Sequence, residues 1–300
     1  MLRQVSVEVP ATSANLGPGF DCLGLALELH NSLTLELADD FRIDIAGEGA
    51  DRLPRNENNL ISQAINTFYE LIGQPMPTLH LTLQNRIPLA RGLGSSAAAV
   101  VAGIFAANAL AGSPMQISDL LRLACKIEGH PDNVAAALFG GLTVAGVCDD
   151  DAFCVKCPVP RDLKAVLFIP DQAMSTRAAR RVLPRLINRA DAVFNISRAS
   201  ALVAALATNQ LQYIEEATRD RLHQPYRQKI FPAMSDLFAA AKEAGALGAF
   251  LSGAGSTICA LCSTNEEAVA EAMMSVGQKR ETPGHTRIVG IAENGVRLLP

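Results

Sequence analysis

The sequence lacks the features that mark several large classes of protein. Its formal net charge is −4, and its aromatic residues, 5% of the chain, are not interleaved with a basic segment, which argues against nucleic acid as the main partner. The most apolar run, Ala97 to Ala107, is shorter than the ~20 residues that a membrane span needs. The first residues alternate polar and apolar side chains and so lack the apolar core of a secretion signal. We therefore expect a cytoplasmic protein with no membrane partner.

Disulfide bonds are not expected. Seven cysteines are an odd number, and a chain of 300 residues with 49% hydrophobic content can fold around an apolar core without such bonds. Two CxxC pairs, Cys154/Cys157 and Cys259/Cys262, are the candidates for a zinc site. Both pairs lie in strand-like sequence, where residues three apart point to opposite faces, so packing in the interior is favoured over metal binding.

No Gly-Lys-Ser or Gly-Lys-Thr is present, which excludes the common P-loop. A different glycine-rich stretch, PLARGLGSSAAA, occupies residues 88–99. Gly92 and Gly94 allow an unusual backbone, and Ser95 begins a run of helix formers. Free amide groups and the positive end of the helix dipole suit a phosphate group there. The residues predicted to hold the phosphates are Leu89, Ala90, Arg91, Gly92, Leu93, Gly94, Ser95, Ser96, Ala97, Ala98 and Ala99.

Two other interpretations of this stretch remain. Gly92 to Ala97 also fits the dinucleotide-binding pattern, which should follow a buried strand and precede an acid by about 20 residues. Pro88 interrupts such a strand, and no acid occurs between Ala97 and Ser118, so this alternative is disfavoured. The stretch could also be a glycine turn before a buried helix that binds no ligand.

Hydrophobic periodicity predicts mixed α and β structure. Strands are expected at residues 5–9, ending at Pro10, then at 23–29, 33–37, 41–45, 79–83 and 165–169, with a turn near Asn31. Helices are expected at residues 59–72, from Ser95 to about 112, from a cap at Ser118 to 127, in a segment that carries Thr176 to Arg189, at 197–207 and at 233–244. The second of these is apolar nearly all round and should be central, and Pro184 should end or kink the fourth. Acidic residues at 149–151 mark the best place for a domain boundary.

Three further segments carry polar groups of different chemistry. The loop at 10–21 contains Thr12, Ser13, Asn15 and Asp21, and it is either a turn or a ligand-gripping loop. The break after a helix at 128–133 contains Glu128, His130, Asp132 and Asn133, which either form a solvated helix end or a site. Thr176 and Arg180 lie one helical turn apart and could address one ligand, whereas Arg177, Arg181, Arg185 and Arg189 look like a solvated stripe.

Together the segments 10–21, 88–99 and 251–257 resemble motifs one, two and three of the GHMP kinases. PATSANLGPGFD near the N-terminus, EGHPDN at 128–133, STRAAR at 175–180 and HQPYR at 223–227 are similar to the homoserine kinase branch of that family. The resemblance implies an α+β fold with two domains. Residues 1–155 would form an N-terminal domain with a left-handed β-α-β unit, and residues 156–300 a ferredoxin-like C-terminal domain.

The resemblance also implies an activity, namely transfer of the γ-phosphoryl group of ATP to the side-chain hydroxyl of L-homoserine in threonine biosynthesis. Ser96 and Glu128 offer hard oxygen ligands for Mg²⁺. Asn59 would lie near the adenine ring. The residues expected to line the substrate pocket are Asn15, Asp21, His130, Asn133, Thr176, Arg180 and Arg227.

Roles for the pocket follow from the chemistry of a zwitterion with a hydroxyl. Asp21 can neutralise the ammonium group, Arg180 and Arg227 can bind the carboxylate, and Asn133 can orient the hydroxyl. We expect Asn133, Arg180 and Asp21 to act in catalysis by alignment, while a role for Asp21 as general base remains the alternative.

Two rival functions are possible on the same scaffold. A mevalonate-type kinase would be expected to carry a lysine near the N-terminal strand, and residues 1–20 contain none. A catalytically silent ligand sensor would be expected to have lost Glu128 or the glycine loop, and both are present. The third motif has Ser256 where the family often has proline. From the resemblance we also expect a homodimer.

Overall fold

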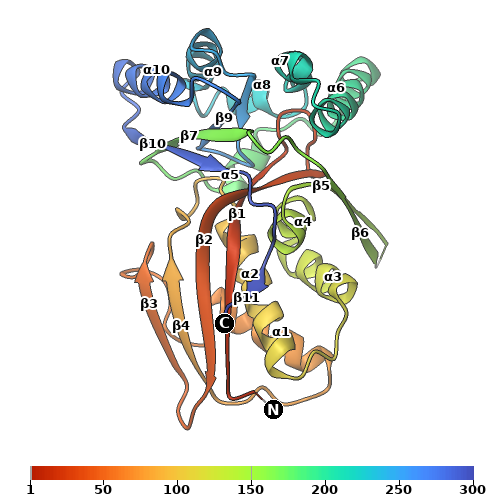
Figure 1. Ribbon diagram of the computed structural model, residues 1–300, viewed down its shortest axis with the longest axis vertical. Coiled ribbons are helices and arrows are strands. Elements are labelled where there is room, and N and C mark those ends of the chain that lie inside the picture. Colours follow the sequence, from red (N-terminus) through yellow and green to blue (C-terminus); the bar gives the residue numbers. More distant parts are fainter. Residues whose placement is uncertain (1, 150) are drawn as a thin grey trace.

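Two β-sheets, one built mainly from the first half of the chain and one from the second, organise the computed structural model, which describes residues 2–149 and 151–300 (Figure 1). The first sheet contains β1 (Gln4–Ala14), β2 (Leu23–Leu37), β3 (Arg42–Gly47), β4 (Leu79–Asn85), β5 (Leu142–Cys148), β6 (Asp151–Cys157) and β11 (Arg297–Leu298). Its strands follow the order β11-β1-β2-β4-β3, and β5 joins β2 to β6. The β3–β4 pair is parallel, and the remaining pairs are antiparallel.

The long strand β2 corrects the expected pair of strands at 23–29 and 33–37. No turn forms at Asn31, because β1 pairs with β2 across this point and β4 pairs from Ser32 onward. The Asn31 side chain instead accepts hydrogen bonds from the backbone amides of Arg86 and Ile87, at 2.7 and 2.9 Å. A polar residue that suggested a turn in the sequence therefore satisfies the backbone of a neighbouring loop.

Strand β1 also continues beyond its predicted end. The register between β1 and β2 shifts between Pro10 and Ala11, so that Pro10 faces His30 while Ala11 faces Leu27. A proline is tolerated in a strand at such a bulge, since no ladder hydrogen bond from its nitrogen is needed there. As a result β1 carries Thr12 to Ala14 directly to the mouth of the loop at 15–22.

Four helices cover the first sheet: α1 (Leu60–Leu71), α2 (Ser95–Leu110), α3 (Ile117–Glu128) and α4 (Asp132–Phe139). Asn59 begins α1 by accepting a hydrogen bond from the amide of Ile61. Helix α3 begins two residues earlier than expected, because Gln116 and Asp119 form a capping box, so that Gln116 is the N-cap and Ser118 falls within the first turn.

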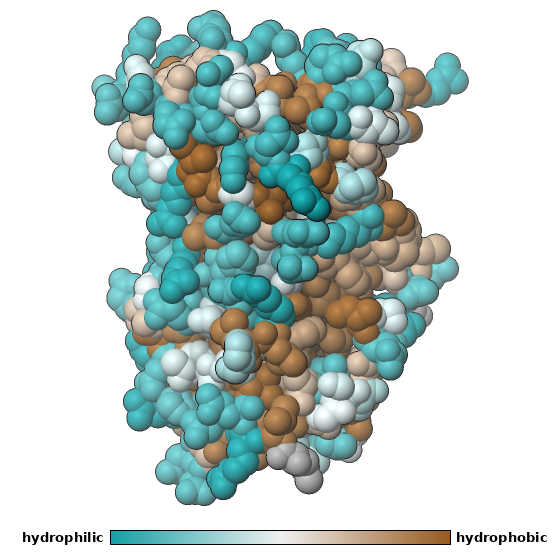
Figure 2. Space-filling model, in the orientation of Figure 1, coloured by the Kyte–Doolittle hydropathy of each residue, from teal (hydrophilic) through white to brown (hydrophobic). Residues whose placement is uncertain are grey.

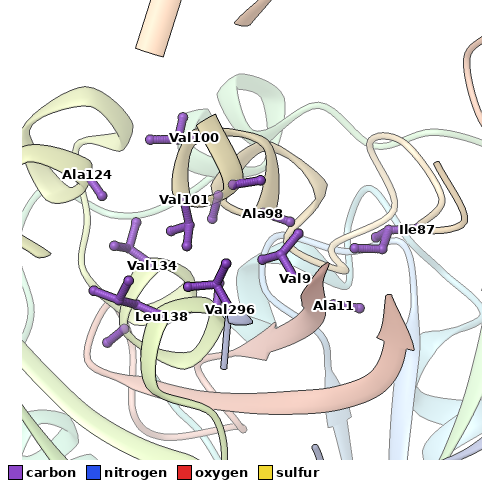
Figure 3. Packing of buried hydrophobic residues seen from close by; sticks show 14 of the residues in the cluster. Val9, Ala11, Ile87, Ala98, Val100, Val101, Ala124, Val134, Leu138 and Val296 are labelled. Atoms are coloured by element: carbon purple, nitrogen blue, oxygen red, sulfur yellow. The ribbon is translucent and has the colours of Figure 1, made fainter. Parts of the chain in front are cut away.

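Helix α2 is central, as its composition predicted. Its valines and alanines are buried on nearly every side, between β1, β2 and the other three helices. Figure 3 shows Ala98 of α2 beside Val9, with Val101 of α2 near Val134 of α4 and Val296. This packing fixes the axis of α2, and therefore fixes the direction in which its N-terminus points.

The second sheet has the order β10-β7-β9-β8, with all neighbours antiparallel. Its strands are β7 (Lys164–Pro170), β8 (Gly248–Leu251), β9 (Ile258–Cys262) and β10 (Gly284–Gly290). The helices of this half are α5 (Thr176–Arg181), α6 (Arg189–Ala207), α7 (Ile214–Ala217), α8 (Gln224–Arg227), α9 (Met234–Glu243) and α10 (Glu266–Lys279), with a 3₁₀ turn at Leu211–Tyr213. This is the ferredoxin-like β-α-β-β-α-β pattern, so the predicted α+β class is confirmed.

Two details of the second half agree with its sequence. Helix α5 ends at Arg181, before Pro184. Cys259 and Cys262 are fully buried in β9, and burial raises the pKa of both thiols, to about 12 for Cys262. Neutral, buried thiols support the packing interpretation of this CxxC pair.

The division into residues 1–155 and 156–300 stays a prediction. Strand β6, which belongs to the first sheet, runs to Cys157. After the second sheet is complete, the chain returns and adds β11 to the first sheet, beside β1. The two halves are therefore joined by more than one segment of the chain.

The surface is unevenly divided between polar and apolar residues. On the face in Figure 2, hydrophilic residues cover most of the upper part, and apolar residues gather in a band over the lower part. Among the described residues one helix, α6, is long and apolar enough to span a bilayer by length and composition. Core helices of soluble proteins share this length and composition.

Candidate active site

A cavity of about 120 Å³ lies where loops from the two halves of the chain meet. Most of the predicted site residues line it: Asn15, Asp21, Ala90, Arg91, Gly92, Leu93, Gly94, Ser95, Ser96, Glu128, His130, Asn133, Thr176, Arg180 and Arg227. Asp132, Gly253 and Ala254 complete the lining. Residues more than 200 positions apart in the sequence thus share one cleft, as the sequence analysis required.

The glycine loop before α2 has the backbone conformation that its composition suggested. Ala90, Gly92 and Gly94 have positive φ angles of 55°, 75° and 67°. Gly94 is the N-cap residue of α2 and supplies no side-chain cap, so the first amides of the helix are left open toward the cavity. Such a helix N-terminus favours an anion through both its free N–H groups and its dipole.

The loop between β8 and β9 packs directly against this glycine loop. Ser252 donates a hydrogen bond of 2.6 Å to the carbonyl of Gly92, and the amide of Thr257 donates to the carbonyl of Arg91 at 3.0 Å. A Cβ atom on Gly92 would lie 2.2 Å from the carbonyl oxygen of Ser252, so only glycine permits this approach. The glycine loop at 88–99 and the loop at 251–257 therefore hold each other in position.

Five residues predicted to hold the nucleotide do not line the cavity. Ala97, Ala98 and Ala99 lie within α2, and the first two are fully buried. Leu89 precedes the open part of the loop. Asn59 uses its side-chain oxygen to cap α1 and its amide group to donate to the carbonyl of Pro54, at 2.8 Å. Its side chain has therefore already formed both types of hydrogen bond within the protein.

Ser96 and Glu128 meet at one wall of the cavity. The Ser96 hydroxyl donates to Glu128 Oε2 at 2.9 Å, which joins the first turn of α2 to the last residue of α3. Burial raises the pKa of Glu128, and the hydrogen bond from Ser96 opposes this only in part. The Glu128 carboxylate and the Ser96 hydroxyl together offer hard oxygen atoms that suit a divalent cation. The charge of such a cation would favour the ionised form of Glu128, which burial disfavours.

Asp21 and Arg180, which also line the cavity, form an ion pair with two hydrogen bonds. Arg180 Nη1 donates to Asp21 Oδ2 at 3.0 Å, and Nη2 donates to Oδ1 at 2.7 Å. Asn15 fixes this corner, because its Oδ1 accepts from the amide of Asp21 and its Nδ2 donates to the carbonyl of Gly253, both at 2.9 Å. Thr176 lies one turn before Arg180 on α5, and both residues line the cavity.

Arg227 is the most unusual charge in the cavity. Its side chain is 2% exposed, and among the described residues it has no carboxylate within ion-pair distance. Its guanidinium donates to the carbonyls of Ala179 and Gly253, at 3.3 and 2.9 Å. Burial, followed by repulsion from Arg180, lowers its pKa to about 10. A buried cation without a counter-ion is costly unless a ligand supplies the negative charge.

The buried side chain of His223 forms a hydrogen bond with Arg227. Burial lowers the pKa of His223 to about 4, so the ring is neutral near pH 7. The neutral ring can donate from Nε2 to the carbonyl of Gly17, at 2.7 Å, and accept from Arg227 Nη1 at Nδ1, at 3.0 Å. This tautomer is the one that satisfies both partners.

The segment at 130–133 was only partly understood from the sequence. Asp132 is 2% exposed and starts α4, where it accepts from the amide of Asn133 at 2.7 Å. His130 Nδ1 lies 3.2 Å from Asp132 Oδ1, and this carboxylate raises the pKa of His130. The sequence pattern includes Asp132 in the polar segment without assigning it to the site, whereas the structure places it in the lining of the cavity. Burial between apolar residues on both sides was the signal that could have identified it.

Comparison with known proteins decides the family. The model of the GHMP kinase N-terminal domain matches residues 59–141, and that of the GHMP kinase C-terminal domain matches residues 202–278. Together they cover more than half of the chain. The chain belongs to the GHMP kinase family. This GHMP kinase is thus an ATP-dependent enzyme, and the open N-terminus of α2 lies within the matched N-terminal region.

Relatives of high similarity carry one name. The homoserine kinase of Moorella thermoacetica is 46% identical over 267 residues, which is 89% of this chain and 90% of that protein. The homoserine kinase of a Synechococcus species is 43% identical over 299 residues, 98% of each chain. The crystal structure of homoserine kinase from Cytophaga hutchinsonii superposes with a TM-score of 0.90 at 32% identity and covers 100% of this chain and 98% of that chain.

More distant structures share the fold alone. Mevalonate diphosphate decarboxylase from Staphylococcus aureus superposes with a TM-score of 0.71 at 15% identity and covers 100% of this chain and 99% of that chain. The architecture is therefore common to proteins whose names describe different reactions. What distinguishes this GHMP kinase must lie in the side chains of its cavity.

The neutral, buried state of His223 predicts a stability effect. The unfolded chain takes up a proton on this histidine below about pH 6.5, whereas the native state resists protonation until about pH 4. The free energy of unfolding should therefore fall as the pH is lowered through this interval, by about 3 kcal/mol from this group. Replacing His223 with Gln, which keeps one donor and one acceptor, should flatten the decline. Denaturant titrations between pH 4 and 7.5 measure it, and equal pH slopes for both proteins would contradict the assignment.

Proposed function

We propose that this GHMP kinase transfers the γ-phosphoryl group of ATP to the side-chain hydroxyl of L-homoserine, as a cytoplasmic enzyme of threonine biosynthesis. The observation that carries the proposal is the unpaired guanidinium of Arg227, which lines the same cavity as the open N-terminus of α2. One end of the cavity suits the phosphates of a nucleotide, and the other suits a small carboxylate. The names of the relatives supply the specific acceptor.

The zwitterion of homoserine matches the charges around the cavity. Arg227 lacks a carboxylate, and the substrate can supply one. Asp21 and Arg180 neutralise each other in the free protein, so an ammonium group and a carboxylate can each take the place of one partner in this pair. Thr176, His130 and Asn133 then offer hydrogen bonds around the acceptor.

The phosphate side needs few residues beyond the backbone. Amides of the glycine loop and of the first turn of α2 would hold the phosphates, and Mg²⁺ would be held by Ser96 and Glu128. The bound cation would neutralise charge on the phosphate oxygens during transfer. The protein itself contributes alignment, exclusion of water and the fixed dipoles of the loop.

Asn133 is proposed to bind the acceptor hydroxyl through its amide, while Asp21 and Arg180 orient the rest of the substrate. A homodimer remains part of the proposal. It is supported by β6, an edge strand whose Phe153 and Val155 side chains are each 55% exposed, because apolar edge strands tend to pair with another chain.

The acceptor is tested by measuring ADP release with homoserine, mevalonate, galactose and threonine in parallel. Homoserine should be strongly preferred, and ³¹P NMR should show the phosphate ester of its side-chain hydroxyl. Preference for mevalonate would favour the mevalonate-type kinase. Absence of turnover with any of the alcohols would favour the silent sensor and refute the proposed reaction.

Glu128→Gln should lower kcat at least 100-fold and raise the Mg²⁺ concentration needed for half-maximal rate, because the amide cannot supply the negative charge. Since burial disfavours the charged form of Glu128, the variant should be no less stable than the parent in metal-free thermal unfolding. Ser96→Ala should show a weaker effect in the same direction. Unchanged activity of Glu128→Gln at limiting Mg²⁺ would contradict the assignment.

Arg227→Ala should raise the homoserine KM by roughly 10- to 100-fold, because it removes a charge-assisted contact made in both the ground and the transition state. The ATP KM should change little. Arg177→Ala is the matched control, since Arg177 is exposed on α5 and does not line the cavity. A normal homoserine KM with a raised ATP KM would move Arg227 to the nucleotide side.

A further inference from the structure

Thr12 lies at the end of β1, is fully buried (0% exposed) and does not line the cavity. Its hydroxyl donates a hydrogen bond of 2.8 Å to Oδ1 of Asn133, which does line the cavity. The two residues are 121 positions apart in the sequence. We propose that Thr12 is a positioning residue, whose hydroxyl fixes the Asn133 side-chain amide so that an N–H group faces the acceptor.

The argument begins with the two partners of Asn133. Its Oδ1 accepts from Thr12, and its Nδ2 donates to Asp132 Oδ1 at 3.2 Å. An amide nitrogen carries two hydrogens, so one N–H remains for a ligand in the cavity. Rotating the amide by half a turn would place Oδ1 against the Asp132 carboxylate, which repels it. The carboxylate of Asp132, which can only accept, therefore selects this orientation, and the hydroxyl of Thr12 holds the amide at this position.

Thr12 is itself held in place by the glycine loop. Its backbone amide donates to the carbonyl of Leu93 at 3.1 Å. A Cβ atom on Gly94 would lie 1.8 Å from Thr12 Oγ1 and 3.0 Å from Asn133 Oδ1. The missing side chain of Gly94 thus lets the first residues of α2 rest against the Thr12–Asn133 hydrogen bond.

The consequence is a direct connection between the two substrates. The same few atoms set the position of the phosphate-binding loop and the orientation of the amide that meets the acceptor. Phosphoryl transfer depends on alignment of the attacking oxygen with the phosphorus, so a small rotation of Asn133 should slow the reaction more than it weakens binding. This inference rests on the proposed transfer to homoserine.

The test compares Thr12→Val, which keeps the shape of the side chain and loses the hydroxyl, with Thr12→Ser, which keeps the hydroxyl. Thr12→Val should lower kcat with homoserine at least 10-fold, while the KM values for homoserine and ATP stay within 3-fold of the parent. Thr12→Ser should recover most of the lost rate. Thr34→Val is the control, because it removes a hydroxyl that forms a 2.8 Å bond to Ser6 elsewhere on the same sheet.

A second measurement does not depend on turnover. In protein labelled with ¹⁵N-asparagine, the side-chain amide signals of Asn133, assigned with Asn133→Ala, should shift or broaden in Thr12→Val and remain parent-like in Thr12→Ser and Thr34→Val. Parent-like kcat and amide signals in Thr12→Val would overturn the inference. Equal loss of rate in Thr12→Ser and Thr12→Val would also overturn it, because the hydroxyl would then not be the group that matters.

The two claims can fail separately. If the parent enzyme does not phosphorylate homoserine, the proposed function fails, while the amide signals still report whether Thr12 orients Asn133. If the parent is active and the signals of Asn133 do not respond to Thr12→Val, the proposed function survives and the role of Thr12 is refuted.

Discussion

The contact between the glycine loop and the loop that joins β8 to β9 is the constraint on which the site depends. It consists of backbone and hydroxyl hydrogen bonds that only a residue without a Cβ atom at position 92 allows. Because α2 is packed on nearly all sides, the glycine loop cannot move away without disturbing the core of the first sheet. The second half of the chain is therefore docked onto a rigid helix N-terminus. The cavity exists because this docking brings α5 and α8 opposite α2.

Charge is distributed in this cavity according to what each ligand would bring. Glu128 is a partly buried carboxylate with a raised pKa, and Arg227 is a buried guanidinium with a lowered pKa. Each shift shows that the charged form is poorly compensated by the protein alone. Asp21 and Arg180, by contrast, compensate each other. A divalent cation bound beside Glu128 would compensate the first charge, and a substrate carboxylate beside Arg227 would compensate the second, so binding of the proposed ligands should stabilise the folded protein.

Most of the residues that the sequence proposes for the site line one cavity, and the reasons why the others do not are physical. Glycine, serine and alanine at 92–99 predict a loop and a helix N-terminus through local propensity alone, and these were correct. Asparagine is suited both to capping a helix and to binding a ligand, so the sequence alone could not decide which of these roles Asn59 has. In the structure its side chain caps α1. The continuous β2 could not be predicted, because Asn31 is a turn former that tertiary hydrogen bonds from Arg86 and Ile87 keep in a strand. Gly253 and Ala254 carry no chemical signal in their side chains, and only the docking of the two loops places them at the cavity.

The geometry also bears on whether Asp21 acts as a base. A general base must present a free lone pair to the hydroxyl from which it removes a proton, and its basicity falls when it binds a cation. Both oxygens of Asp21 accept hydrogen bonds from Arg180 in the free protein. Each oxygen of Asp21 keeps a further lone pair, but Asp21 could use it as a base only beside the guanidinium of Arg180 and in exchange for its contact with the ammonium group of the substrate. Alignment by Asn133, with the proton leaving to a phosphate oxygen, needs no such exchange. The ion pair of Asp21 therefore favours transfer without a dedicated base. In that case the rate depends on Thr12 and Asp132, which hold Asn133 in position.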